Sequence, residues 1–249
     1  MDWSMPLPTL SIDTATEVLA LALGEGDRIL AKSGIDAGRS HLELLLPGVQ
    51  SLLEGAGFTV RDIDAIVAGT GPGTFSGLRV GIATARALAQ SLEIRLSGFS
   101  TLEALALGLA GVSPAELVLP IIDAKRSQVF ARLYKKEGKN TVRAESDVLC
   151  LDPRELLEEL AKITGGKVGA AGNGVLAYRD IFVSAGQLEP LEPDHPGNRV
   201  DACWHLRADR AEASAVYNPG RLLSVVPQYV REPDADKTIL LRKKEPWLQ

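Results

Sequence analysis

The stretch Gly69-Thr70-Gly71-Pro72-Gly73-Thr74-Phe75-Ser76-Gly77 joins an apolar run, 64–70, to a segment of helical periodicity from about Leu78 to Leu92. A glycine-rich turn between a predicted strand and a predicted helix offers free N–H groups and the positive end of the helix dipole to an anion. The same glycines also permit a tight turn and close packing of the helix on the sheet. The sequence leaves both interpretations open.

Two common phosphate-binding motifs are excluded for this turn. No Gly-Lys-Ser/Thr follows it, so it is not a Walker A loop. It also departs from the dinucleotide-binding fingerprint, because Pro72 lacks an N–H donor and Glu93 precedes the next predicted strand instead of ending one. A phosphate contact at this turn would therefore use neither of these geometries.

The flanking segments alternate between apolar runs and helical periodicity. Further strands are predicted at 9–13, 18–23, 28–33 and 94–99. Helices are predicted from Ser40, where Ser40 and Glu43 have the spacing of a capping box, and at 101–109. This alternation predicts an α/β fold in which at least part of the sheet is parallel.

The second half of the chain repeats the order of the first. An apolar run that ends in Asp, a polar turn and a second apolar run occur at 9–23 and again at 118–134. Each half then has a predicted helix, which lies at 153–163 in the second half, and a strand with a glycine turn, at 67–73 and 168–174. Agreement in the order of both features favours a duplicated fold over chance similarity.

The matching apolar runs end in Asp13 and Asp123. A carboxylate at the end of a strand can face a magnesium ion and phosphates, or it can cap the turn by accepting backbone N–H bonds. We hold both interpretations open. The candidates to face a nucleotide or phosphate are Asp13, Thr14, Gly71, Gly73, Thr74 and Asp123.

Two predicted helices carry faces suited to association with another protein. The helix after Ser40 has a leucine-rich face, and the helix after the glycine turn has a small residue at every fourth position, which lets another backbone approach closely. Burial of the same residues in the core of this chain is the competing interpretation. The candidates for a partner interface are Leu42, Leu45, Leu46, Val49, Gly77, Gly81, Ala85 and Ala89.

Composition bounds the class of protein. The chain has 249 residues, 45% of them hydrophobic and 24% charged, which is usual for a globular protein able to bury a sizeable core. Its net charge of −5 argues against a surface that grips nucleic acid unaided. Without a basic leader or a long apolar segment, the chain is expected to be cytoplasmic with no membrane contact, and Cys150 and Cys203 are expected to be buried thiols.

The C-terminal part has weaker signals. A Pro- and Gly-rich segment, 186–200, predicts an exposed loop, 201–213 predicts a helix and 227–230 a last strand. Residues 236–249, with the basic triplet 242–244, are expected to form a disordered tail. We therefore predict an N-terminal lobe at 1–110 and a C-terminal lobe at 111–235.

Several chemistries lack sequence support. His41, His195 and His205 lie on separate segments and form no metal-binding pair, and Cys203-Trp204-His205 has the wrong spacing for zinc. No Gly-x-Ser-x-Gly elbow is present, so nothing indicates a serine nucleophile. No catalytic residue and no metal ligand are predicted.

At 69–81 the sequence resembles the G-x-GPG-[ST]-F-[ST]-GLR-[IV]-G signature of the TsaB (YeaZ) family, and the similarity continues to Ala89. Further family-like segments are Ile12-Asp13-Thr14, 40–47, 100–105, 123–129 and Gly172-Asn173-Gly174. The resemblance covers about 9–180. It implies a duplicated two-lobe actin-like (ASKHA, ribonuclease H-like) fold.

The resemblance also implies a role in the complex that installs threonylcarbamoyladenosine beside the anticodon of tRNA. The expected partners are the catalytic paralogue TsaD and the ATPase TsaE, with tRNA reached through the complex and a homodimer left open for the isolated chain. Where TsaD carries a metal-binding H-x-x-x-H pair, this chain has Thr101 and Leu105, and a leucine cannot ligate a metal. The resemblance thus implies a non-catalytic subunit that needs no cofactor itself, with ATP possible at the level of the complex.

Two alternatives remain on the sequence alone. The Asp-ended hairpins are compatible with an independent ATP-binding kinase or ATPase of the actin-like class. A glycoprotease-like peptidase is a weaker alternative, since the sequence offers neither a zinc site nor an activated nucleophile.

Overall fold

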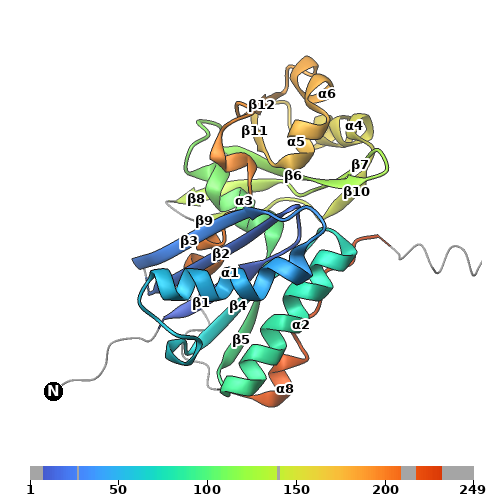
Figure 1. The fold of residues 1–249 in the computed structure, drawn as a ribbon. Helices are drawn as coiled ribbons and strands as arrows, with labels where there is room; N and C mark the ends of the chain where they lie inside the picture. Colours follow the sequence, from blue (N-terminus) through green and yellow to red (C-terminus); the bar gives the residue numbers. More distant parts are fainter. Residues whose placement is uncertain (1–7, 27, 139–140, 209–216, 232–249) are drawn as a thin grey trace, which may run out of the picture.

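The fold comes from a computed structural model that describes residues 8–26, 28–138, 141–208 and 217–231. Two lobes, each built on one sheet, are stacked one above the other in Figure 1, with helix α3 (Thr101–Ala110) at their junction. No helix among the described residues is long and apolar enough to cross a membrane.

The sheet of the first lobe contains the strands predicted around the glycine turn. Its strands, in the order in which they lie side by side, are β3 (Arg28–Asp36), β2 (Val18–Glu25), β1 (Thr9–Asp13), β4 (Ala65–Gly71) and β5 (Arg95–Ser100). The three strands β1, β2 and β3 pair antiparallel as consecutive hairpins, whereas β4 is parallel to both β1 and β5. The parallel part follows from the helices that connect these strands.

The second sheet repeats this order. Its main path is β10 (Leu149–Leu151), β7 (Gln128–Ala131), β6 (Leu117–Lys125), β11 (Val168–Ala171) and β12 (Leu188–Pro190). The pairs have the same directions as their counterparts in the first sheet. Two further strands, β8 (Tyr134–Gly138) and β9 (Thr141–Ala144), extend this sheet from β6.

The helices follow the same repeat. In the first lobe α1 (His41–Gly55) precedes β4 and α2 (Phe75–Leu92) follows it; in the second lobe α4 (Pro153–Ile163) precedes β11, and α5 (Asn173–Ala177) and α6 (Arg179–Ser184) follow it. Matching strand order, strand direction and helix placement confirm the predicted duplication. The architecture is the two-lobe actin-like plan.

Three buried clusters hold the fold together. One lies between the first sheet and helices α1 and α2, and includes Leu10, Ile12 and Leu45. A second lies in the second lobe around Phe182. The third joins the lobes, because it combines Val67 of β4 and Leu105 of α3 with residues of the second sheet.

The C-terminal part returns to the first lobe. Helix α7 (Cys203–Ala208) packs on β2 and β1, and α8 (Pro219–Leu222) packs on α2. In Figure 1 the red-orange α8 lies beside α2 in the lower lobe. The described residues from about 203 onward therefore contact the first lobe, whereas the sequence-based prediction assigned 111–235 to the C-terminal lobe. The predicted tail at 236–249, with the basic triplet 242–244, lies outside the described residues.

Three local predictions also need correction. Residues 227–230 are not in a strand, and the loop predicted at 186–200 contains β12 and a short 3-10 helix at Pro196–Asn198. Helix α1 begins at the predicted place, but the Ser40 side chain makes no capping hydrogen bond. These segments take their conformations from contacts distant in sequence, which local patterns do not report.

Candidate functional site

The glycine turn packs directly against the turn between β1 and β2. A Cβ on Gly69 would overlap the carboxylate of Asp13, and a Cβ on Gly77 would overlap the carbonyl oxygen of Thr14. The N–H of Thr74 donates to the carbonyl oxygen of Ala15 at 2.8 Å, which ties the two turns together. These contacts favour the packing interpretation of the glycines, since no side chain could occupy the same space.

Asp13 lies at the centre of a buried polar network. Its Oδ2 accepts a hydrogen bond from the hydroxyl of Thr101 at 2.7 Å and lies 2.9 Å from Nε2 of His205. Its Oδ1 accepts the N–H of Ala15 at 2.8 Å. Asp13 is 1% exposed and His205 is fully buried. Both carboxylate oxygens therefore already have partners within the chain.

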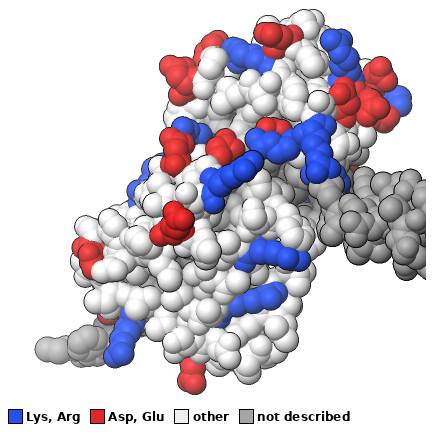
Figure 2. Space-filling view, turned by 45° about the vertical axis from the view of Figure 1, so that its right-hand side comes forward, with Lys and Arg blue, Asp and Glu red and all other residues white. Residues whose placement is uncertain are grey.

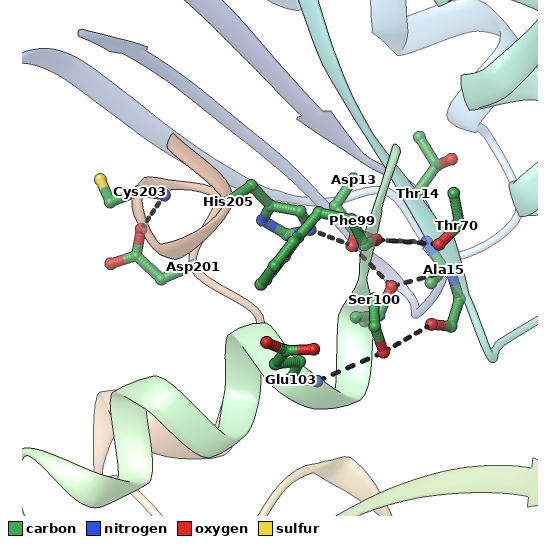
Figure 3. A network of polar contacts seen from close by, with 12 residues as sticks. Asp13, Thr14, Ala15, Thr70, Phe99, Ser100, Glu103, Asp201, Cys203 and His205 are labelled. Carbon is green, nitrogen blue, oxygen red and sulfur yellow. Dashed lines mark hydrogen bonds and ion pairs between the residues drawn. The ribbon is translucent and has the colours of Figure 1, made fainter. Parts of the chain in front are cut away.

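Four elements position this network, as Figure 3 shows. Asp13 ends β1, Thr101 begins α3 and His205 extends from α7, which lies across the same face of the sheet. The ring of Phe99, at the end of β5, contacts the His205 ring edge-on at 5.5 Å between centroids. The Thr101 hydroxyl also accepts the N–H of Gly71 at 3.2 Å, so the network connects to the glycine turn.

The predictions that Asp13, Thr14 and Gly71 face a nucleotide are corrected by this burial. Thr14 is 1% exposed, and its hydroxyl donates to the carbonyl oxygen of Gly77. Gly71 is buried as well, while Gly73 is partly exposed and closely covered by Ala15. The physical reason is that the glycine turn and α7 cover the end of β1, so hydrogen-bond partners within the chain take the place of solvent.

The contact of His205 with Asp13 was not among the features predicted from the sequence. The sequence signal was limited to a histidine within a predicted helix, and nothing in that pattern indicates a contact across 192 positions. Thr101, which the family resemblance places at a lost metal-ligand position, is fully buried in the same network, and Leu105 lies in the cluster between the lobes.

Asp123 has a different environment from Asp13. Its Oδ2 forms an ion pair with Nζ of Lys125 at 2.6 Å, and its Oδ1 accepts the N–H of the same residue at 2.8 Å. The N–H of Asp123 donates to the side chain of Asn173 at 3.0 Å. The carboxylate therefore caps the β6–β7 turn, in which Arg126 and Ser127 adopt left-handed conformations with φ of 57° and 58°.

A cavity of about 630 Å³ opens between the lobes beside these turns. Its lining residues are Glu17, Gly38, Arg39, His41, Thr74, Ser76 and Lys125. Of the predicted phosphate-facing residues, Thr74 lines it. Glu17 bridges the lobes here, because its carboxylate accepts a hydrogen bond from the Asn173 amide at 2.6 Å. Burial lowers the pKa of His41, which favours the neutral imidazole.

The residues present do not fit a magnesium nucleotide bound between the two Asp-ended hairpins. Such a complex needs carboxylate oxygens free to face the metal and its waters. Both oxygens of Asp13 already have partners and Asp13 does not line the cavity, while Asp123 is paired with Lys125. Within the described part of the chain, no group of three or more His, Cys, Asp or Glu side chains is arranged to hold a metal ion.

The leucine-rich face of α1 divides into two parts. Leu45 and Val49 are buried in the core of the first lobe, 1% and 4% exposed, so they are not available to a partner. Leu42 and Leu46 are 75% and 55% exposed. A groove of about 390 Å³ lies beside Leu46 and reaches across to Leu88 of α2. The exposed part of α1 is therefore a candidate association surface.

The stripe of small residues on α2 lies inside this chain. Gly77, Gly81, Ala85 and Ala89 are all buried. A Cβ on Gly81 would overlap the Thr14 hydroxyl, and Ala85 and Ala89 belong to the core of the first lobe. The prediction that these four residues meet a partner is corrected, because the close approach that they permit is between α2 and its own sheet.

Comparison with known proteins identifies a matching family model and similar sequences. The family model for TsaD: tRNA N6-adenosine threonylcarbamoyltransferase matches residues 33–217. The tRNA threonylcarbamoyladenosine biosynthesis protein TsaB of Escherichia coli (strain K12) is 33% identical over 177 residues, which cover 71% of this chain and 76% of that protein.

Two solved structures show the same fold. YeaZ from Pseudomonas aeruginosa superimposes with a TM-score of 0.72 at 26% identity, covering 90% of this chain and all of that chain. The ethanolamine utilization protein EutJ from Carboxydothermus hydrogenoformans gives a TM-score of 0.50 at 11% identity, covering 81% of this chain and 90% of that one, which is a likeness of fold alone.

Proposed function

Because this chain belongs to the TsaB (YeaZ) family of tRNA threonylcarbamoyladenosine biosynthesis proteins, we propose that it is a non-catalytic subunit that binds and activates a TsaD-type partner. The observation that carries the proposal is the closed environment of Asp13. The strand-end carboxylate that could face a metal nucleotide is instead bonded to Thr101 and His205 of the same chain.

The proposal assigns the exposed part of α1 to the partner. Leu42 and Leu46 are large apolar side chains on the exposed face of α1, whose opposite face already packs in the core. The core of this chain therefore does not use these two side chains, and a partner can contact them. Apolar side chains beside a groove are typical anchors in protein interfaces. The occupant is a TsaD-type chain, whose own fold is related to this one through the shared family model.

The remaining partners follow from the family. A TsaE-type ATPase joins the complex, ATP is used at the level of the complex, and tRNA is its substrate. The chain itself requires no cofactor and works in the cytoplasm. A homodimer through the same face of α1 is the alternative state of the isolated chain.

Omission of this chain from a reconstituted reaction tests the proposal. The reaction contains the cognate TsaD- and TsaE-type proteins, threonylcarbamoyl-adenylate and tRNA, and the rate of tRNA modification is measured with and without this chain. We expect the rate to fall to background without it, and no modification by this chain alone. An unchanged rate without this chain would refute the activating role.

The independent-ATPase alternative is tested separately. Calorimetry with ATP and magnesium on the isolated chain should give no binding heat and no turnover, because Asp13 has no oxygen left to face the metal. Saturable binding with turnover would restore that alternative.

A further inference from the structure

Phe75, Arg79 and Tyr229 form an exposed stack on the surface of α2. Phe75 and Tyr229 are 39% and 44% exposed, and their ring centroids lie 5.0 Å apart. The Arg79 guanidinium lies 3.8 Å from the Phe75 centroid, and its Nε donates to the Tyr229 hydroxyl at 3.2 Å. Two aromatic rings and one guanidinium plane are thus held together at the protein surface.

The stack adjoins the cavity between the lobes, because Phe75 lies between Thr74 and Ser76, which both line it. Arg39 of the first lobe and Lys125 of the second line the same cavity. Figure 2 shows a group of Lys and Arg side chains at the junction of the lobes, above a largely uncharged surface that is crossed by two further basic side chains.

Two carboxylates at this surface, Asp123 and Glu17, offset part of its positive charge. Lys125 is paired with Asp123, and Glu17 is engaged with Asn173. Arg39 and Arg79 have no carboxylate partner within the described part of the chain. Arg39, Arg79 and Lys125 against Asp123 and Glu17 sum to a charge of +1, whereas the chain as a whole carries −5.

We propose that the stack of Phe75, Arg79 and Tyr229, together with Arg39 and Lys125 at the adjoining cavity, is a contact surface for unpaired RNA. Exposed aromatic and guanidinium planes stack on bases, and nearby cations meet the phosphates. A fully paired duplex presents no free base faces, so the surface favours a loop. The choice of RNA over other anionic partners rests on the proposed function, in which tRNA is the substrate.

A purely structural role for the stack makes a different prediction. Tyr229 belongs to the segment that runs from α8 along α2, which is also held by hydrogen bonds from Arg86 to the Val225 carbonyl and from the Gln228 N–H to Thr70. If Tyr229 merely fastens this segment, its loss changes stability and leaves RNA binding unaffected. If it stacks on a base, its ring is needed and its hydroxyl is not.

The test is fluorescence anisotropy with a labelled stem-loop RNA and a fully paired RNA duplex of equal length, at low and at moderate salt. The variants are Tyr229→Ala, Tyr229→Phe and Arg79→Ala. Two controls match them: Lys162→Ala removes an exposed cation from α4, and Leu223→Ala trims an exposed side chain of the same C-terminal segment. Circular dichroism and urea unfolding check that each variant is folded. Both the isolated chain and its complex with the TsaD-type partner are measured.

We expect tighter binding of the stem-loop than of the duplex, weakened by salt. Tyr229→Ala and Arg79→Ala should each raise Kd about tenfold, since stacking of one base contributes on that order, whereas Tyr229→Phe and both controls should bind like the wild type. Unchanged binding in the two Ala variants, or equal loss in the Lys162 control, would overturn the proposal, as would absence of RNA binding by both chain and complex. Complex formation is scored separately by size-exclusion chromatography, so failure to associate counts against the proposed function alone.

Discussion

Nε2 of His205 lies 2.9 Å from Oδ2 of Asp13, although 192 positions separate them in the sequence. The contact joins the end of the first strand to a helix near the C-terminus and closes the strand end on which a metal nucleotide would depend. Since both side chains are almost fully buried, the pair is part of the structure of the first lobe and not an open site.

Replacement of His205 by Ala is expected to destabilise the chain by about 3 kcal/mol, because a buried carboxylate loses a partner and a void remains. Urea unfolding followed by circular dichroism measures the change. His195→Ala is the matched control, since the His195 side chain accepts a local hydrogen bond from the Gly197 N–H and has no other hydrogen bond among the described residues. Equal effects of the two substitutions would show that the contact with Asp13 contributes little.

Gly81→Ala is expected to destabilise the first lobe by about 1–3 kcal/mol, and Gly81→Leu by more, because the added atoms overlap the Thr14 hydroxyl. Gly55→Ala, in α1, is the control: its Cβ meets no atom within 4 Å. Thermal unfolding compares the variants. A stable Gly81→Leu variant that no longer associates would instead place this stripe in an interface.

The neutral state of His41 predicts a pH dependence of stability. Its pKa is lowered by burial, so below the ordinary pKa of about 6.5 the unfolded chain binds a proton that the folded chain does not. Neutral His41 therefore contributes to the free energy of unfolding above about pH 6.5, and this contribution is lost as pH falls below that value. As pH falls from about 7.5 to about 5.5, the unfolding free energies of wild type and His41→Gln should converge. A constant difference would contradict a lowered pKa.

The double variant Leu42→Ser, Leu46→Ser should have an unfolding free energy within about 0.5 kcal/mol of the wild-type value, because both side chains are exposed in the single chain. The same double variant should weaken association with the TsaD-type partner, measured by size-exclusion chromatography. Ile163→Ser removes an exposed apolar side chain, 49% exposed, from α4 in the second lobe and should not. Unimpaired association of the α1 variant would move the interface elsewhere.

Much of the fold could be predicted from local patterns. The helix at 153–163 has the predicted bounds, because its apolar spacing and its N-terminal residues give the same start. The repeat of an Asp-ended hairpin, a helix and a glycine-turn strand also predicts the matching order of the two sheets.

The site could not be predicted to the same extent, because it depends on contacts between distant segments. Leu42 and Leu45 both fit the apolar period of α1, and only the position of the sheet decides which is buried. His205 meets Asp13 because α7 crosses back to the first lobe. Residues 227–230 have strand-like composition, yet they pack beside α2, where Gln228 bonds to Thr70 outside any ladder.

The central claim is that this chain acts by binding its partner and not by holding a metal nucleotide of its own. The most direct measurement is the rate of tRNA modification in the reconstituted reaction with two variants, Asp123→Asn and Leu42→Glu with Leu46→Glu. Our account predicts a wild-type rate for Asp123→Asn and loss of stimulation for the α1 variant. Loss of the rate in Asp123→Asn, with full stimulation by a folded α1 variant, would contradict it.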